Sequence, residues 1–236
     1  MRKLFSFAAA GLAMVMAIPA GAATCADSSF RKLQFFSDDT GGILWQSPRV
    51  DSPLDTGTAR LMVHVLSQDG NDYAGAFGNC TGIEGKLVTA VMNLSFEFMN
   101  LTGNPFVHIS AGAPRYSVDL DTNNNGVFDT GVDVSASLAA FHCEEVRKED
   151  TRWSRAYWTS RNAAGCSLFV GSEQFTSNGT TSAWALMAAA HPTWKVLKAY
   201  FIMDEEGTTF VDRLAFQSQQ FYGSGAPKSC SSEAGC

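Results

Sequence analysis

The 236-residue sequence has little charge, since Asp, Glu, Lys and Arg together make up 17% of it, and it has no basic run. Contacts to phosphate require clustered Lys and Arg, so this composition argues against a nucleic-acid-binding protein. After residue 23, no apolar stretch reaches the roughly 20 residues that a membrane-spanning helix needs. Apolar residues make up 45% of the chain, which excludes intrinsic disorder for most of it.

The common catalytic motifs are also missing. The sequence contains no GxSxG nucleophile turn, no HExxH zinc motif and no GxxxxGK[ST] phosphate loop. Ser29 and Lys32 match SxxK, but that pattern occurs often by chance. There is no CxxC and no Cys/His pair at zinc spacing. The motifs therefore do not identify a reaction.

The first 23 residues have the pattern of a secretory signal peptide. Arg2 and Lys3 precede an apolar stretch at residues 4–18, and small residues follow at 20–23. Removing this segment takes away two positive charges and changes the net charge from −6 to −8. We expect secretion to the periplasm or the medium, one domain over residues 24–222, and a loose Ser/Gly/Cys-rich tail over 223–236.

All six cysteines follow the predicted signal peptide, and an even number in an exported chain indicates disulfides. Cys143 and Cys166 each border an apolar run and enclose a polar, aromatic segment, so we predict that they pair. Cys230 and Cys236 would close a small ring in the tail. Cys25 and Cys80 are left as the third pair by elimination.

Most of the remaining sequence consists of short apolar or alternating runs separated by Gly, Asn and Asp, a pattern typical of β-strands. The strand candidates are residues 61–66, 87–92, 93–99, 106–110, 116–120, 167–170, 195–203, 208–216 and 219–222. One helix is expected at residues 183–190, with Ser182 as its N-cap and Pro192 after its end. The pattern predicts an all-β fold, a jelly-roll-like β-sandwich with one short helix.

The strongest local motif runs from Asp119 to Asp133, where side-chain oxygens recur at every second position. From Asp121 the spacing copies the first nine positions of an EF-hand calcium loop, but position twelve is Val132 and the flanks read as strands. We expect a structural Ca²⁺ whose ligands are Asp121, Asn123, Asn125, the Val127 carbonyl and Asp129, with Asp119 or Asp133 completing the shell. The alternative is a hairpin turn at Asn125-Gly126, which can coexist with the ion.

A second signal is Asp212, which alternation places on the same strand face as Phe210, Leu214 and Phe216. A carboxylate on an apolar face is costly unless a cation compensates it. Arg115 or a bound ion is the candidate partner. At a strand edge, Asp212 would instead reach water.

Three segments carry a resemblance: Gly112-Ala-Pro-Arg-Tyr-Ser-Val, Thr181-Ser-Ala-Trp-Ala and Asp204-Glu-Glu-Gly-Thr-Thr-Phe-Val-Asp-Arg. They resemble secreted bacterial β-jelly-roll domains, and the Val-Asp-Arg ending is similar to extracellular carbohydrate-binding modules of that fold. The resemblance covers roughly residues 87–222 and implies a jelly roll. In those modules an Asp at the place of Asp212 often helps to hold a structural calcium.

Aromatic side chains are the candidates for a ligand surface. Trp153, Tyr157 and Trp158 lie with Arg155 in a polar segment, where rings could stack on sugars and Arg could bind hydroxyls or carboxylates. The alternative is that these rings belong to the core. We therefore expect a secreted, non-catalytic module that binds a glycan or a cell-surface ligand.

Two other classes remain open from the sequence. A glycan-active hydrolase would need two carboxylates brought together by folding, because neighbours such as Glu144-Glu145 point to opposite faces of a strand. An adhesive or structural surface protein would associate with itself.

Overall fold

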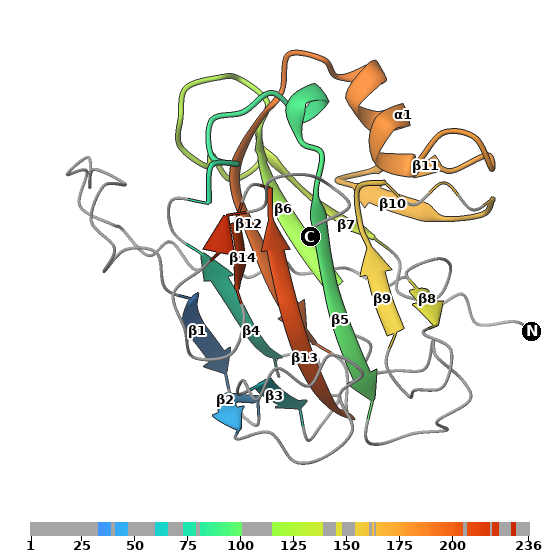
Figure 1. Ribbon diagram of the computed structural model, residues 1–236. Helices are drawn as coiled ribbons and strands as arrows, with labels where there is room; N and C mark the ends of the chain where they lie inside the picture. The colour runs from blue at the N-terminus through green and yellow to red at the C-terminus, as the bar shows by residue number, and fades with distance from the viewer. Residues whose placement is uncertain are drawn as a thin grey trace, which may run out of the picture.

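The computed structural model describes residues 33–38, 41–46, 60–65, 73–78, 81–100, 115–138, 145–147, 154–160, 162, 164–204, 207–217, 219–221 and 228–229. These residues form two antiparallel β-sheets and one α-helix (Figure 1). The prediction of an all-β sandwich with one short helix is confirmed. Within these residues, no helix has the length and apolarity needed to cross a bilayer.

One sheet has seven strands in the spatial order β1-β4-β12-β6-β7-β10-β11. Their bounds are β1 (Leu33–Asp38), β4 (Tyr73–Gly78), β12 (Lys195–Met203), β6 (Arg115–Asp121), β7 (Val134–Leu138), β10 (Ser167–Val170) and β11 (Glu173–Thr176). The long strands β12 and β6 lie next to each other near its centre. The loop between β6 and β7 is the Asn-rich segment that the sequence analysis identified.

The other sheet is built around β13 (Gly207–Phe216) and β5 (Leu94–Asn100), which pair antiparallel. On one side follow β9 (Ser154–Tyr157) and β8 (Glu145–Arg147). On the other side lie β14 (Gln219–Phe221) and β15 (Lys228–Ser229), and β3 (Arg60–Val65) joins β13 to β2 (Gly42–Gln46).

Alternation along the strands creates the core between the sheets. On β6, Tyr116 and Leu120 point inward and are fully buried, whereas Asp119 lies on the outer face. On β5 the inner residue Phe96 contacts Tyr116 and Phe201 of the facing sheet, with ring centroids 5.4 Å apart in both pairs. These edge-on aromatic contacts join the two sheets.

The helix α1 (Ala183–Ala190) closes one end of the sandwich. Ser182 caps it as predicted, because the backbone N–H of Ala185 donates to Ser182 Oγ at 3.1 Å. Trp184 is buried, and its indole N–H donates to the Val88 carbonyl at 3.1 Å. Val88 belongs to a 3₁₀ turn, η2 (Val88–Ala90), so the strand expected at residues 87–92 is wrong. The expected strand at 106–110 lies outside the described residues.

Candidate functional site

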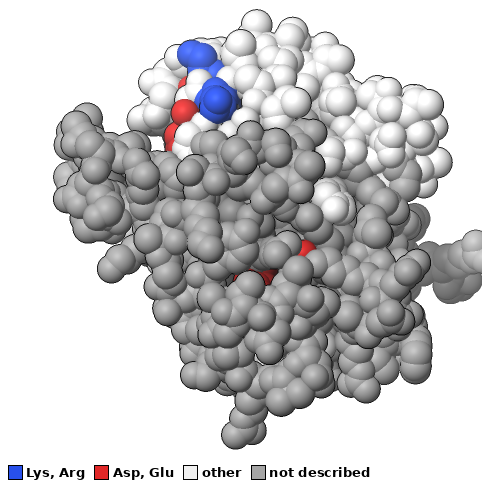
Figure 2. Space-filling model, in the orientation of Figure 1, with Lys and Arg blue, Asp and Glu red and all other residues white. Residues whose placement is uncertain are grey.

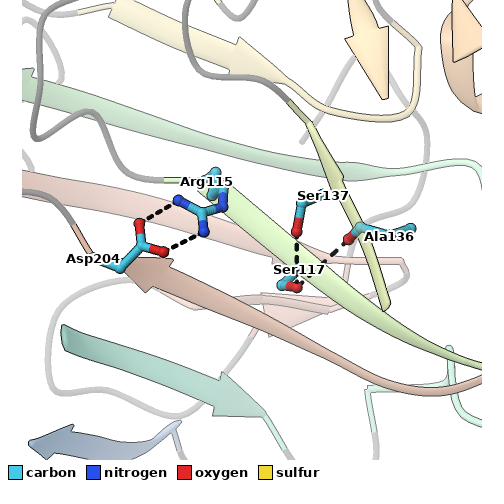
Figure 3. A network of polar contacts seen from close by, with 5 residues as sticks. All are labelled: Arg115, Ser117, Ala136, Ser137 and Asp204. Carbon is cyan, nitrogen blue, oxygen red and sulfur yellow. Dashed lines mark hydrogen bonds and ion pairs between the residues drawn. The ribbon is translucent and has the colours of Figure 1, made fainter. Parts of the chain in front are cut away.

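A cluster of polar side chains lies on the outer face of the seven-stranded sheet, where β6, β7 and β12 run side by side. The Asp119 carboxylate accepts a hydrogen bond from Ser135 Oγ at 2.6 Å and one from the Tyr200 hydroxyl at 3.4 Å. One step along β6, the hydroxyls of Ser117 and Ser137 are 3.2 Å apart (Figure 3). Asp119 is a predicted calcium ligand, and in the structure its carboxylate accepts hydrogen bonds from two hydroxyl groups.

Titratable groups in this cluster have shifted pKa values. Burial raises the pKa of Asp119, although the Ser135 hydrogen bond and the charge of Lys198 partly offset that rise. Burial lowers the pKa of Lys198, and the charge of Asp119 partly restores it. Burial and then the charge of Asp119 raise the pKa of Tyr200. Neighbouring groups with shifted pKa values are typical of functional sites, and also of structural ion-pair networks.

Aromatic rings extend the same face across β12, β4 and β1. The Lys198 ammonium lies 3.5 Å from the ring centroid of Phe77. Phe36 contacts Phe77, Tyr73 and Tyr200, with centroid separations of 6.2, 6.0 and 6.0 Å. All four rings are half-buried. We call this surface the aromatic–polar face, and its members are Phe36, Tyr73, Phe77, Ser117, Asp119, Ser135, Lys198 and Tyr200.

A glycine makes this arrangement possible. A Cβ atom at Gly75 would lie 2.3 Å from the tip of the Phe36 ring and 2.3 Å from the Phe201 carbonyl oxygen. Any side chain at position 75 would therefore displace the ring or the neighbouring strand. Gly75 keeps the Phe36 ring on the outer face of the sheet.

The structure gives Arg115 a different acidic partner from the one expected. Arg115 makes a two-pronged ion pair with Asp204, just after the end of β12 (Figure 3). Asp212 belongs to the other sheet. Arg115 thus links β6 to the end of its neighbouring strand and stabilises one edge of the aromatic–polar face.

Asp212 lies directly opposite Glu97 in the ladder between β13 and β5. The register shifts between Asp212 and Ala215, so Leu214 and Phe216 are in the core while Asp212 is on the opposite face. The prediction that Asp212 shares a strand face with Leu214 and Phe216 is therefore wrong, because a β-bulge lies between them. Acidic atoms are visible over β5 and β13 in Figure 2.

Both carboxylates of this pair are buried, with Glu97 1% exposed and Asp212 7% exposed. Each has an interaction partner. Arg155 is the register partner of Glu97 on its other side, in β9. The pairing of Glu97 with Asp212 depends on the register between distant segments, which has no local signal in the sequence.

The Asn-rich loop between β6 and β7 is held by its own side chains. The Asp121 carboxylate accepts from the backbone N–H groups of Asn125 and Gly126, at 3.1 and 2.9 Å. The side-chain amides of Asn123 and Asn125 both donate to Asp129 Oδ2, at 2.8 and 2.5 Å. These two amides present N–H groups rather than oxygens to the carboxylate. Gly126 has a φ of 86°, which glycine adopts without strain, but the connection between the paired strands β6 and β7 spans residues 122–133 and is longer than a two-residue Asn-Gly turn.

Asp133 holds the base of this loop. Its carboxylate accepts from the backbone N–H of Thr122 at 2.7 Å and of Asp129 at 2.8 Å. Burial raises the pKa of Asp133, but these backbone hydrogen bonds and the Thr122 hydroxyl more than offset burial, so its pKa lies below the ordinary value. Among the described residues, no three His, Cys, Asp or Glu side chains form a metal-binding group.

The predicted ligand surface around Trp158 is different in the structure. Trp158 is only 3% exposed and belongs to the core, where its ring lies 5.0 Å from that of Trp184. Its indole N–H has no hydrogen-bond partner in the described part of the chain. Tyr157 is half-buried at the end of β9. Trp153 and the side chain of Arg155 lie outside the described residues.

Cys166 is buried and disulfide-bonded, and it is the one cysteine within the described residues. Its pairing with Cys143 stays a prediction, because Cys25, Cys80, Cys143, Cys230 and Cys236 lie outside those residues. The predicted signal peptide lies outside them as well. Comparisons with protein families, curated proteins and solved structures found no match to this chain.

Proposed function

We propose that this protein is a secreted, non-catalytic β-sandwich module that binds a glycan or a cell-surface ligand on the aromatic–polar face. The observation that carries the proposal is the strip of four half-buried rings beside the hydrogen-bonded group of Asp119, Ser135 and Tyr200. A sugar offers an apolar ring face for stacking and hydroxyls for hydrogen bonds. Both kinds of contact are available here on neighbouring strands.

This surface suits a ligand better than the segment around Trp158. A ring that is 3% exposed has no free face for stacking, whereas Tyr73 and Tyr200 are half-buried and have polar neighbours. A binding site commonly combines apolar lining with a few convergent polar groups. The sheet also holds these side chains in place, which reduces the ordering cost of binding.

A glycan array with fluorescently labelled protein tests this proposal. Tyr73→Ala and Tyr200→Ala should each reduce retention on the glycans that retain the wild-type protein, because each removes a ring from the strip. Phe128→Ala, which alters an exposed ring on the Asn-rich loop, is the matched control and should bind normally. Unchanged retention of both tyrosine variants, with melting temperatures like that of the wild type, would overturn the proposal.

A structural calcium in the Asn-rich loop is part of the proposal. Its support is the donor set, because Asp121, Asp129 and the amide oxygens of Asn123 and Asn125 come from one short loop, and Ca²⁺ prefers oxygen ligands. The two amides now donate to Asp129. They would have to turn their oxygens toward the ion to bind it.

One observation favours a second candidate function, a glycan-active hydrolase. Residues directly opposite on paired strands have Cβ atoms about 4.5–5.5 Å apart. Retaining glycosidases place their two carboxyl groups about 5–5.5 Å apart. Glu97 and Asp212 are such an opposite pair. Their burial ranks this candidate below the binding module, because a substrate would have to reach both carboxylates.

A further inference from the structure

The Asn-rich loop carries apolar side chains that the fold does not bury. Val127 and Val132 are 59% and 54% exposed, and Phe128 is 37% exposed. Hydrophobic side chains scattered singly over a surface need no explanation, but a group of them at one place indicates an interaction site. Here three of them lie within six residues of one loop.

A second segment adds to the same end of the sandwich. Leu87 and Met92 are also exposed, and they flank η2. An isolated bridge joins Leu87 to Lys195, and Lys195 is the register partner of Asp121, where the loop begins. Figure 1 shows the two segments at the same end of the molecule. Five of the seven large apolar side chains that are exposed among the described residues lie at this end.

Charges of both signs lie at this end, and one of them, the half-buried Asp129 between Phe128 and Val132, accepts hydrogen bonds from the side-chain amides of Asn123 and Asn125. Asp121 and Asp133 are buried and accept hydrogen bonds from backbone N–H groups inside the loop. Residues 122–128 carry no charge. Lys86 and Lys195 flank the loop: the Lys86 carbonyl accepts from the N–H of Val196, the residue after Lys195. Figure 2 shows basic atoms beside acidic ones at this end.

We propose that this end of the sandwich docks on the surface of an anionic lipid bilayer through the exposed side chains of Leu87, Met92, Val127, Phe128 and Val132. The apolar side chains would enter the boundary between headgroups and acyl chains, and Lys86 and Lys195 would lie against anionic headgroups. The shape favours a bilayer over a protein, because these side chains stand on projecting loops, and a projection fits a deformable interface without a complementary groove. The two lysines supply the charge complementarity.

Sedimentation with lipid vesicles tests this proposal. The wild-type protein should bind vesicles of phosphatidylcholine with phosphatidylglycerol more strongly than vesicles of phosphatidylcholine alone. The double variant Val127→Ser/Phe128→Ser should lower the partition coefficient between vesicles and water about tenfold or more. The reason is that it removes two apolar side chains whose transfer from water into the bilayer would favour binding. The control is Phe169→Ser, which alters a similarly exposed residue, 44% accessible, on β10. It should bind like the wild type.

A second pair of substitutions separates charge from apolar contact. Lys86→Gln/Lys195→Gln should weaken binding to the anionic vesicles and leave the weak binding to neutral vesicles unchanged. All samples contain the same calcium concentration. If calcium links protein carboxylates to anionic lipid, it will then do so equally in the control Phe169→Ser and in the other variants. Matching melting temperatures will show that each variant is folded.

Three results would overturn the proposal. They are the absence of wild-type binding to the anionic vesicles, equal binding by the double variant and Phe169→Ser, and concentration-dependent dimerisation that the double variant abolishes. The last would assign these exposed apolar side chains to contact with a second copy of the chain. The test is independent of the glycan proposal, because the double variant leaves the aromatic–polar face intact.

Discussion

The backbone N–H of Thr122 donates to Asp133 Oδ1 at 2.7 Å, and this contact joins the end of β6 to the start of β7. The Thr122 hydroxyl donates to the same oxygen at 3.0 Å, and the other oxygen accepts from the Asp129 N–H. A residue expected to complete a calcium shell therefore already holds the loop by accepting backbone hydrogen bonds.

Asp133→Asn should destabilise the protein at neutral pH by about 1–3 kcal/mol, because an amide can accept through only one of its two heavy atoms. The folded-state pKa of Asp133 lies below its unfolded value, so its carboxylate contributes stability above the unfolded pKa of about 3.9. That contribution is lost as the pH falls through the lowered pKa. Urea unfolding of both proteins from pH 7 to about pH 2 should show the difference shrinking in acid. A constant difference would contradict this account.

Where the apolar pattern is regular, the sequence predicts the strands of this fold, namely β3, β5, β6, β10, β12, β13 and β14. The strands β1, β2, β4, β7, β8, β9, β11 and β15 are not among the expected ones. On β5 the alternation of Leu94, Phe96 and Phe98 with polar residues matches the observed inner and outer faces. The helix is equally well predicted, because the Ser182 cap and the run of helix formers are local signals. Long-range register has no such signal. The bulge after Asp212 breaks the period of two, and its pairing with Glu97 follows only from how β13 and β5 align.

The candidate site was harder to predict for the same reason. Phe36, Phe77 and Tyr200 come from three separate segments, and only the sheet order places them side by side. Trp158 was considered for a ligand surface because its sequence neighbours are polar. In the structure it packs against Trp184, which lies on the helix α1 and is distant in sequence. In this chain, the polarity of neighbouring residues was a poor guide to the exposure of a large ring.

Calcium should raise the melting temperature of the wild-type protein. A ligand that binds only the folded state stabilises that state by mass action. The unfolded chain does not hold the oxygen ligands of the Asn-rich loop together, so calcium should bind the folded protein. Thermal unfolding in EDTA and in millimolar calcium measures the difference. Asp129→Asn should remove the increment, because it deletes the carboxylate on which Asn123 and Asn125 converge. Identical melts of the wild type in both buffers would eliminate the structural calcium.

Trp158→Ala should destabilise the fold by about 3–5 kcal/mol, the usual cost of removing a buried large aromatic side chain. The reason is its burial against Trp184 in the core. Trp158→Phe keeps an aromatic ring and removes an indole N–H that has no partner in the described part of the chain, so its effect should be smaller. Urea unfolding compares the three proteins. A Trp158→Ala protein that is fully stable but no longer retained on glycans would restore the stacking role.

Substitutions of Glu97 and Asp212 can distinguish a glycan-binding module from a glycan-active hydrolase. A binding module should release no reducing ends from the glycans that it retains, however long the incubation. A retaining hydrolase should release them, and both Glu97→Gln and Asp212→Asn should abolish that release while glycan retention persists, because nucleophile and acid are both required.

Reducing-sugar assays on the wild type and both variants measure this outcome, and Glu84→Gln serves as a control at an exposed carboxylate. We expect no release from the wild type. Release that survives in either variant would exclude the pair as the catalytic carboxylates and would require another site. If the wild type releases reducing ends and both variants lose this activity with unchanged melting temperatures, the protein is a hydrolase and the proposal of a non-catalytic binding module is wrong.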